Sequence, residues 1–191
     1  MERHPDDYKV PPLSWEKIAE IANRARDFFD LGNRPVTKIT TLIEQLSKRT
    51  FKDGFILNIS FFECPQGQTP ARVRVNHHEK KLTLIIDRET WDWASDGDPD
   101  SIWKIAHELG HILLHRVKIH AFSSSLERKN SFINEEESSE WQANAFAFHF
   151  LIPDSLVQSL GTVKSITRFC NVEERIAEKR IAEFRRRDKY R

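Results

Sequence analysis

The chain has 191 residues, which is long enough for one domain with an apolar core. Hydrophobic residues make up 39% of it and charged residues 31%, a composition typical of a globular protein with a strongly charged surface. The formal net charge is only +1, so the molecule as a whole has no strong field that would favour nucleic acid or an anionic membrane.

The start of the chain and its cysteines bear on its location. The first residues contain no apolar stretch, so we expect no signal peptide. No apolar run approaches the roughly 20 residues that a membrane helix needs. The two cysteines, Cys64 and Cys170, are far apart in the sequence and are predicted to be buried free thiols. Together these features predict a cytoplasmic protein.

The first half of the chain mixes helical and strand patterns. Residues 1–13 are polar and contain prolines, so we expect an arm that lies on the surface. The spacing of apolar residues then predicts helices over 14–29 and 36–46, a strand over 55–62, and a hairpin of strands 71–76 and 82–86. The second strand of this hairpin could offer an edge to an extended substrate. His77 and His78 lie in the turn and would point to opposite faces, so they are not expected to share a metal ion.

The second half is predicted to be helical. Helices are expected over 98–115 and 134–152, and a pair of shorter helices over 163–169 and 173–187. The first two are apolar nearly all round, which predicts that both are buried. The segment between them, 116–129, is predicted to contain a strand and then a polar stretch that could form a rim or lid over a site between the two helices.

These elements predict an α+β fold. We expect a mostly helical single domain with a small antiparallel or mixed sheet next to the helix over 98–115. The predicted organisation is an N-terminal arm at 1–13, a main domain at 14–160, and a C-terminal helical pair at 161–191 packed on the same domain.

Residues 107–111 form the pattern H-E-x-x-H, which is typical of zinc proteases. Two histidines four positions apart lie one above the other on a helix, so His107 and His111 can both reach one metal ion. Glu108 would lie beside that ion, where a carboxylate can take the proton of an attacking water. Burying these side chains in an apolar helix would be costly without a metal ion or hydrogen-bond partners.

A catalytic zinc site needs three protein ligands and one open position. Glu140, 29 positions after His111 and near the start of the second buried helix, is the best candidate for the third ligand. Asn144 lies one turn further on the same face and could accept the free N–H of a ligating histidine. The alternative is that Glu140 belongs to an exposed acidic cluster at 135–140.

Two other residues remain as possible third ligands. His115 lies one turn beyond His111, and each turn climbs about 5.4 Å whereas a zinc–nitrogen bond is only about 2 Å. His115 is therefore predicted to support the site rather than bind the metal. Glu137 is the next candidate after Glu140.

Two separated segments carry a resemblance to a known family. Residues 107–115 and 140–147, the latter followed by 151–153, resemble the ImmA/IrrE family of metallopeptidases, and the resemblance covers about residues 30–185. It implies a zincin-like fold and a zinc-dependent, gluzincin-like endopeptidase. The targets it implies are helix-turn-helix transcriptional repressors of phages, mobile elements or stress regulation.

The resemblance also implies roles for individual residues. Carried over by position, the zinc ligands are His107, His111 and Glu140, the general base is Glu108, and Asn144 supports the site. Gln142 departs from the family, because many relatives have an acid at this position. No tyrosine or histidine outside the motif has a spacing that argues for a role in stabilising the transition state.

A second hypothesis is that the protein acts by binding, as a zinc-containing anti-repressor or interaction module without turnover. In either case the repressor is expected to be a separate protein. The C-terminal helical pair resembles a helix-turn-helix, and residues 185–187 are basic. Acidic residues alternate with these basic ones, so direct DNA binding is not expected.

Overall fold

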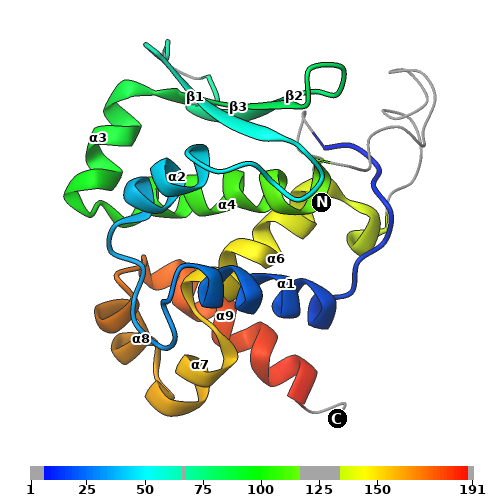
Figure 1. Cartoon of the computed structure of the whole chain (residues 1–191). Coiled ribbons are helices and arrows are strands. Elements are labelled where there is room, and N and C mark those ends of the chain that lie inside the picture. The colour runs from blue at the N-terminus through cyan, green and yellow to red at the C-terminus, as the bar shows by residue number, and fades with distance from the viewer. Residues whose placement is uncertain (1–6, 66–67, 117–133, 189–191) are drawn as a thin grey trace.

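The computed structural model describes residues 7–65, 68–116 and 134–188, and it shows a sheet covering one side of a helical body (Figure 1). In chain order its elements are α1 (Trp15–Phe28), α2 (Ile39–Ser47), β1 (Ile56–Phe62), β2 (Ala71–Asn76), β3 (Lys81–Asp87), α3 (Arg88–Asp96), α4 (Pro99–His115), the 3₁₀ turn η2 (Glu135–Glu137), α6 (Ser139–Leu151), α7 (Asp154–Leu160), α8 (Val163–Cys170) and α9 (Glu174–Asp188). The prediction of a mostly helical α+β domain with a small mixed sheet is confirmed.

The sheet has the strand order β1-β3-β2, with β3 parallel to β1 and antiparallel to β2. The predicted hairpin of β2 and β3 is therefore confirmed. Leu82, Leu84 and Ile86 of β3 are fully buried, because β3 lies between two strands and above α4. The prediction that this strand offers a free edge is wrong, since the edge next to the site belongs to β2.

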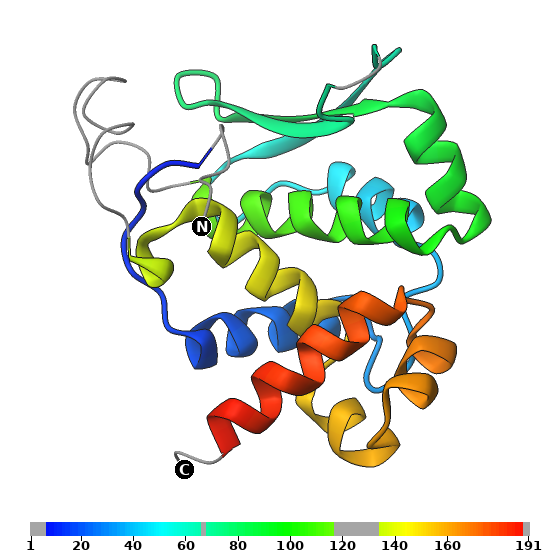
Figure 2. The ribbon, with the colours of Figure 1, turned by 180° about the vertical axis from the view of Figure 1, so that it is seen from behind.

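Helix α4 runs through the middle of the molecule, between the sheet and α6 (Figures 1 and 2). It begins as predicted, because the Asp98 side chain accepts a hydrogen bond from the backbone N–H of Ser101 at 2.8 Å and Pro99 occupies the first turn. Ile102, Ile105 and further apolar residues along the helix are fully buried. This burial holds the H-E-x-x-H segment rigidly at the centre of the fold.

Helices α4 and α6 approach most closely at Gly110. A Cβ atom at this position would lie 3.0 Å from both the Cα and the carbonyl oxygen of Ala143, and 3.2 Å from the Cβ of Phe146. Any larger residue would therefore push the two helices apart. The glycine inside the motif thus allows α6 to bring its own side chains up to those of α4.

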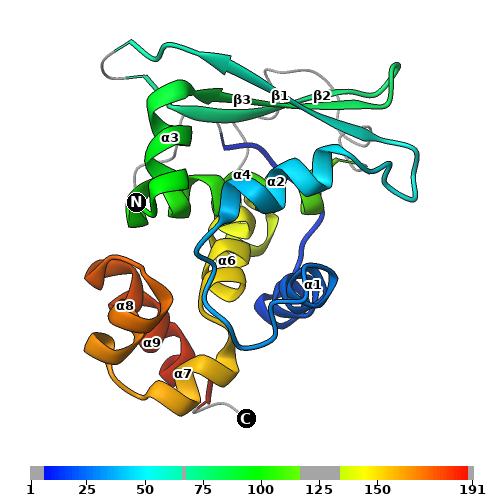
Figure 3. The same cartoon turned by 60° about the vertical axis from the view of Figure 1, so that its left-hand side comes forward.

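The C-terminal helices lie below α6, on the side away from the sheet (Figure 3). Arg180 of α9 is fully buried, donates to the carbonyl oxygen of Ile152 at 2.9 Å, and forms an ion pair with Asp154. Its guanidinium also donates to Nδ1 of His149 on α6, at 3.2 Å. These contacts attach α9 to the end of α6.

The sequence missed two helices, α3 and α7, because short polar segments carry little periodic signal. The segment predicted as strand and rim, 116–129, lies outside the described residues apart from its first. The domain boundaries at 13 and 160 stay predictions. No helix among the described residues is long and apolar enough to cross a membrane.

The buried His149 predicts a loss of stability in mild acid. Burial and the charges of Arg180 and Arg187 lower its pKa from 6.5 to about 2. The unfolded chain therefore binds a proton below about pH 6.5 that the folded chain does not, so this stability is present above pH 6.5 and lost as the pH falls. Urea unfolding at pH 7 and pH 5 should show a loss of about 2 kcal/mol from this residue.

The variant His149→Gln is the control for this prediction. Its side-chain oxygen can still accept from Arg180 but does not titrate, so the difference in unfolding free energy between pH 7 and pH 5 should shrink by about 2 kcal/mol. An identical pH dependence in the native protein and the variant would contradict the prediction.

Candidate metal centre and active site

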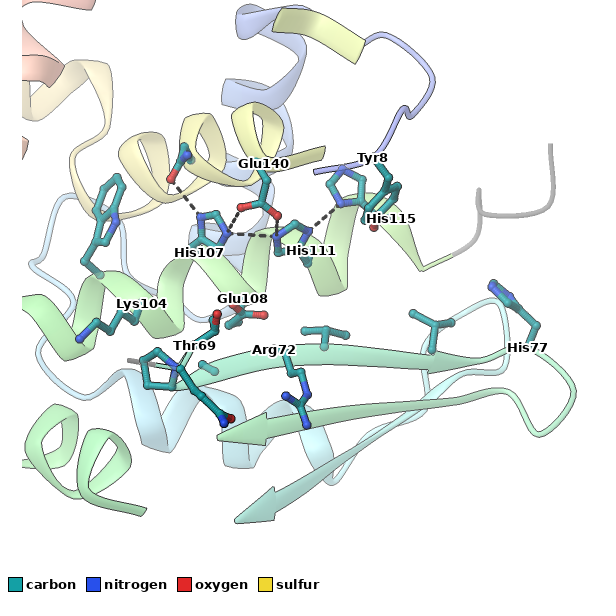
Figure 4. A pocket seen from close by; sticks show the side chains of 17 residues that line it. Tyr8, Thr69, Arg72, His77, Lys104, His107, Glu108, His111, His115 and Glu140 are labelled. Carbon is teal, nitrogen blue, oxygen red and sulfur yellow. Dashed lines mark hydrogen bonds and ion pairs between the residues drawn. The ribbon is translucent and has the colours of Figure 1, made fainter. Parts of the chain in front are cut away.

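A cavity of about 860 Å³ opens between α4, the start of α6, β2 and the N-terminal arm. His107, Glu108 and His111 reach it from α4, and Glu140 reaches it from α6 (Figure 4). These are the four residues predicted to hold the metal ion and perform the chemistry, and the fold brings them together.

The three predicted ligands face one another at distances that fit one metal ion. The Nε2 atoms of His107 and His111 lie 3.0 Å apart, and each lies 3.2 Å from a carboxylate oxygen of Glu140. Two ligand atoms about 2.1 Å from a zinc ion at a tetrahedral angle are about 3.4 Å apart. Among the described residues, these three form the one group of histidine, cysteine and acidic side chains close enough to share an ion.

His107 is oriented by Asn144. The two side chains meet at 3.0 Å between Nδ1 and Oδ1, and the amide oxygen can only accept. Nδ1 of His107 therefore carries the proton, which leaves the lone pair of Nε2 pointing at the ligand cluster. This is the contact predicted for Asn144 from its position one turn after Glu140.

His111 is oriented by a longer chain of contacts. Its Nδ1 lies 3.0 Å from Nδ1 of His115, and Nε2 of His115 lies 3.0 Å from the side-chain oxygen of Gln142. Because this oxygen accepts, Nε2 of His115 carries a proton and its Nδ1 accepts from His111. Nε2 of His111 is then free of a proton and can bind a metal. His115 thus contacts a predicted ligand and lies outside the ligand group, which agrees with its spacing.

Gln142 is held in one orientation by the backbone. Its amide nitrogen donates to the carbonyl oxygens of Pro11 and Glu136, at 2.9 and 2.6 Å, and the side chain is fully buried. A carboxylate could not make these two donations. At this position, where the sequence departs from the family, the amide sets the tautomer of His115. This role of Gln142 could not be predicted from the sequence, because it depends on a contact with Pro11, far away in the chain.

The charges of the site favour a cation. Burial works to raise the pKa of Glu140, but the contacts of its carboxylate with the imidazoles of His107 and His111 outweigh it and hold this pKa well below its ordinary value. Burial works to lower the pKa of His107, and the hydrogen bond with Glu140 and the nearby carboxylates raise it overall. Burial and the neighbouring His111 lower the pKa of His115 to about 3, which keeps this relay residue neutral.

The other candidates lie elsewhere. The side chain of Glu137 pairs with Lys9 at 3.1 Å, outside the ligand group. His77 lines the far end of the cavity and does not join the metal group (Figure 4). Cys64 and Cys170 are both free thiols, as predicted, but only Cys170 is buried, and Cys64 is half-buried. The side chain of Glu140 is only 15% exposed, so its assignment to an exposed acidic cluster is wrong.

The relay predicts that Gln142 controls metal affinity through His115 and His111. In Gln142→Leu, Nε2 of His115 loses its acceptor, so the proton on His111 is no longer confined to Nδ1. We expect the zinc affinity to fall about 10-fold, the size typical of groups that orient metal ligands. Competition with a fluorescent chelator measures this affinity, and ¹⁵N shifts of the imidazoles report the tautomers.

The matched control is Gln158→Leu, which alters an exposed glutamine on α7. It should leave both the affinity and the tautomers unchanged. A folded Gln142→Leu protein with native zinc affinity would show that the relay has no effect on the metal site.

Comparison with known proteins gives one family. The model of a peptidase family, described as the IrrE N-terminal-like domain, matches residues 57–181, which is more than half of the chain. The chain is also similar to a Mycobacterium tuberculosis transcriptional regulator of known structure, with 16% identity and a TM-score of 0.45 over 86% of this chain. It spans 51% of that regulator. No curated protein matches the chain at a significant level.

Proposed function

The chain belongs to the IrrE N-terminal-like family of peptidases, and from this premise we propose that it is a zinc-dependent endopeptidase. The observation that carries the proposal is the group of His107, His111 and Glu140 at the edge of the cavity, with Glu108 beside it. Two imidazoles and one carboxylate are the donor set of many catalytic zinc sites.

The residues have separate tasks in this reaction. The chemistry that zinc supplies in such a site is to polarise a peptide carbonyl and to make water a nucleophile near neutral pH. Glu108 takes the proton of the attacking water and passes it to the leaving amine nitrogen as the peptide bond breaks. Its side chain is largely buried and lines the same cavity as the ligands, close to them in Figure 4.

Strand β2 is the element that we propose to hold the substrate. It is the outer strand of the sheet on the cavity side, and its residues Val73 and Val75 line the cavity. An extended peptide could pair with its backbone as a further strand while apolar side chains contact the two valines. The substrate edge that we propose is therefore β2. The sequence had suggested β3 instead.

We propose a separate helix-turn-helix transcriptional repressor as the substrate and the cytoplasm as the place of action. The substrate rests on the resemblance to the ImmA/IrrE family, and the free cysteines favour a reducing compartment. Direct DNA binding is not proposed, because Arg186 and Arg187 near the C-terminus pair with Glu183. The alternative function is binding of the repressor without cleavage.

The test is cleavage of a proteome-derived peptide library by zinc-loaded protein, with products identified by mass spectrometry. We expect new peptide ends that disappear when zinc is removed with a chelator and return when zinc is restored. A library left intact by zinc-loaded, folded protein, together with intact purified helix-turn-helix repressors, would favour the binding function over the peptidase.

A further inference from the structure

The N-terminal arm is part of the site and does not simply lie on the surface. Residues 7–13 run alongside the start of α6, and Lys9 pairs with Ser138 in an antiparallel bridge. The backbone N–H of Val10 donates to the carbonyl oxygen of Glu137 at 2.8 Å, and that of Leu13 donates to Glu136 at 3.0 Å. The arm thus lies as an extended segment beside the residues that lead to Glu140.

Asp7 attaches the arm directly to the beginning of α6. Its carboxylate accepts hydrogen bonds from the hydroxyls of Ser138 and Ser139, at 3.0 and 3.1 Å, and from the backbone N–H of Glu140 at 3.3 Å. An acid at a helix N-terminus is also favoured by the helix dipole. The backbone of Glu140, the third predicted ligand, is therefore hydrogen-bonded to the arm.

Tyr8 follows Asp7, and hydrogen bonds hold both its backbone N–H and its backbone carbonyl oxygen. Its N–H donates to the hydroxyl of Ser139, and its carbonyl oxygen accepts from the backbone N–H of Ser139, both at 3.1 Å. The side chain lines the same cavity as the ligands, and its ring meets His115 edge-on with the centroids 6.0 Å apart (Figure 4). A phenol is thereby presented next to the metal site on a rigid backbone.

The cationic side chains that line the cavity lie away from the ligands (Figure 4). Lys104 pairs with Asp100 at 2.6 Å, and the guanidinium of Arg72 lies over the ring of Phe62. His77 lies at the far end of the cavity (Figure 4). A peptide carbonyl that gains negative charge during attack needs a donor beside the metal, and a phenolic hydroxyl is one at neutral pH.

We propose that the hydroxyl of Tyr8 donates a hydrogen bond to the carbonyl oxygen of the peptide bond under attack, so that the arm supplies a catalytic group. The inference rests on the proposed function. No local pattern predicts this role, because Tyr8 is 131 residues away from Ser139, which holds its backbone, and lies before the matched domain. Thr69 on the opposite wall, beside Glu108 in Figure 4, is the rival hydroxyl.

The first test needs no substrate. Acetohydroxamate binds zinc through a carbonyl oxygen, and its affinity for zinc-loaded protein can be measured by calorimetry. We expect Tyr8→Phe to weaken this binding about 10-fold, the effect of losing a hydrogen bond to a charged acceptor, with zinc affinity unchanged. Lys9→Ala, whose side chain pairs with Glu137 outside the cavity, should bind as the native protein does.

The outcomes separate this inference from the proposed function. Equal binding by native and Tyr8→Phe protein, including undetectable binding by both, would overturn the role of Tyr8, and weakening by Thr69→Val alone would assign the donor to Thr69. With a peptide that the native protein cleaves, Tyr8→Phe should lower kcat about 100-fold with little change in KM. Equal cleavage rates in the native protein and in Tyr8→Phe would contradict the inference about Tyr8 but would support the proposed peptidase function.

Discussion

Glu108→Gln is expected to lower the rate of peptide cleavage about 1,000-fold while leaving the zinc content at the native level. The amide has nearly the same shape as the carboxylate but cannot take the proton of the attacking water. Glu108 is 7% exposed and lies outside the group of metal ligands, so its replacement removes no ligand and should leave the metal bound. The measurement pairs initial cleavage rates with elemental analysis of the same preparations.

The control for Glu108→Gln is Glu137→Gln, which makes the same chemical change at an acid that pairs with Lys9 outside the metal group. It should keep both the cleavage rate and the zinc. If Glu108→Gln protein still cleaved at the native rate, the general base would be another residue. If native protein bound a repressor without cutting it and Glu108→Gln bound equally well, the interaction-module hypothesis would hold instead.

Glu140→Ala is expected to weaken zinc binding by at least about 100-fold, because it removes one of three ligands that share a binding free energy on the order of 10 kcal/mol. The variant keeps His107 and His111, whose Nε2 atoms lie 3.0 Å apart in the native protein, but two imidazoles alone make a weak site. The fold should survive, since the side chain of Glu140 faces the cavity. Elemental analysis and chelator competition measure the loss.

Two further variants make the result for Glu140→Ala specific. Glu137→Ala should keep its zinc, since the side chain of Glu137 contacts Lys9 and not the metal group. Zinc retained undiminished in Glu140→Ala would move the third ligand to another residue, with Glu137 and His115 examined next. Absence of any divalent metal from native protein, even after zinc is supplied, would exclude the peptidase mechanism.

Local features of the sequence were sufficient for the central helix and its chemistry. Asp98 and Pro99 predicted where α4 begins, and the helical period predicted that His107 and His111 share one face. Capping and periodicity depend on residues within a few positions of one another, so they can be read without knowing the fold. Glu140 was found because a polar residue on an otherwise apolar helix needs a partner.

Other parts of the site were decided by the tertiary structure. The order β1-β3-β2 moved the substrate edge from β3 to β2, because strand order depends on contacts between distant segments. Gln142 acquires its role through Pro11 and His115, which lie far from it in the chain. The approach of α4 to α6 at Gly110 likewise exists only in the folded protein.

The N-terminal arm shows most clearly the difference between what local sequence predicts and what tertiary contacts decide. Its polar, proline-bearing sequence has no periodicity, and so it predicted a surface segment. In the fold its backbone pairs with the start of α6, which places Asp7 at Glu140 and Tyr8 in the cavity. The sequence determined which side chains could bind a metal and move a proton, because those properties belong to each residue and its helix. Which distant residues surround them was decided by packing, because it depends on where segments far apart in the chain come together.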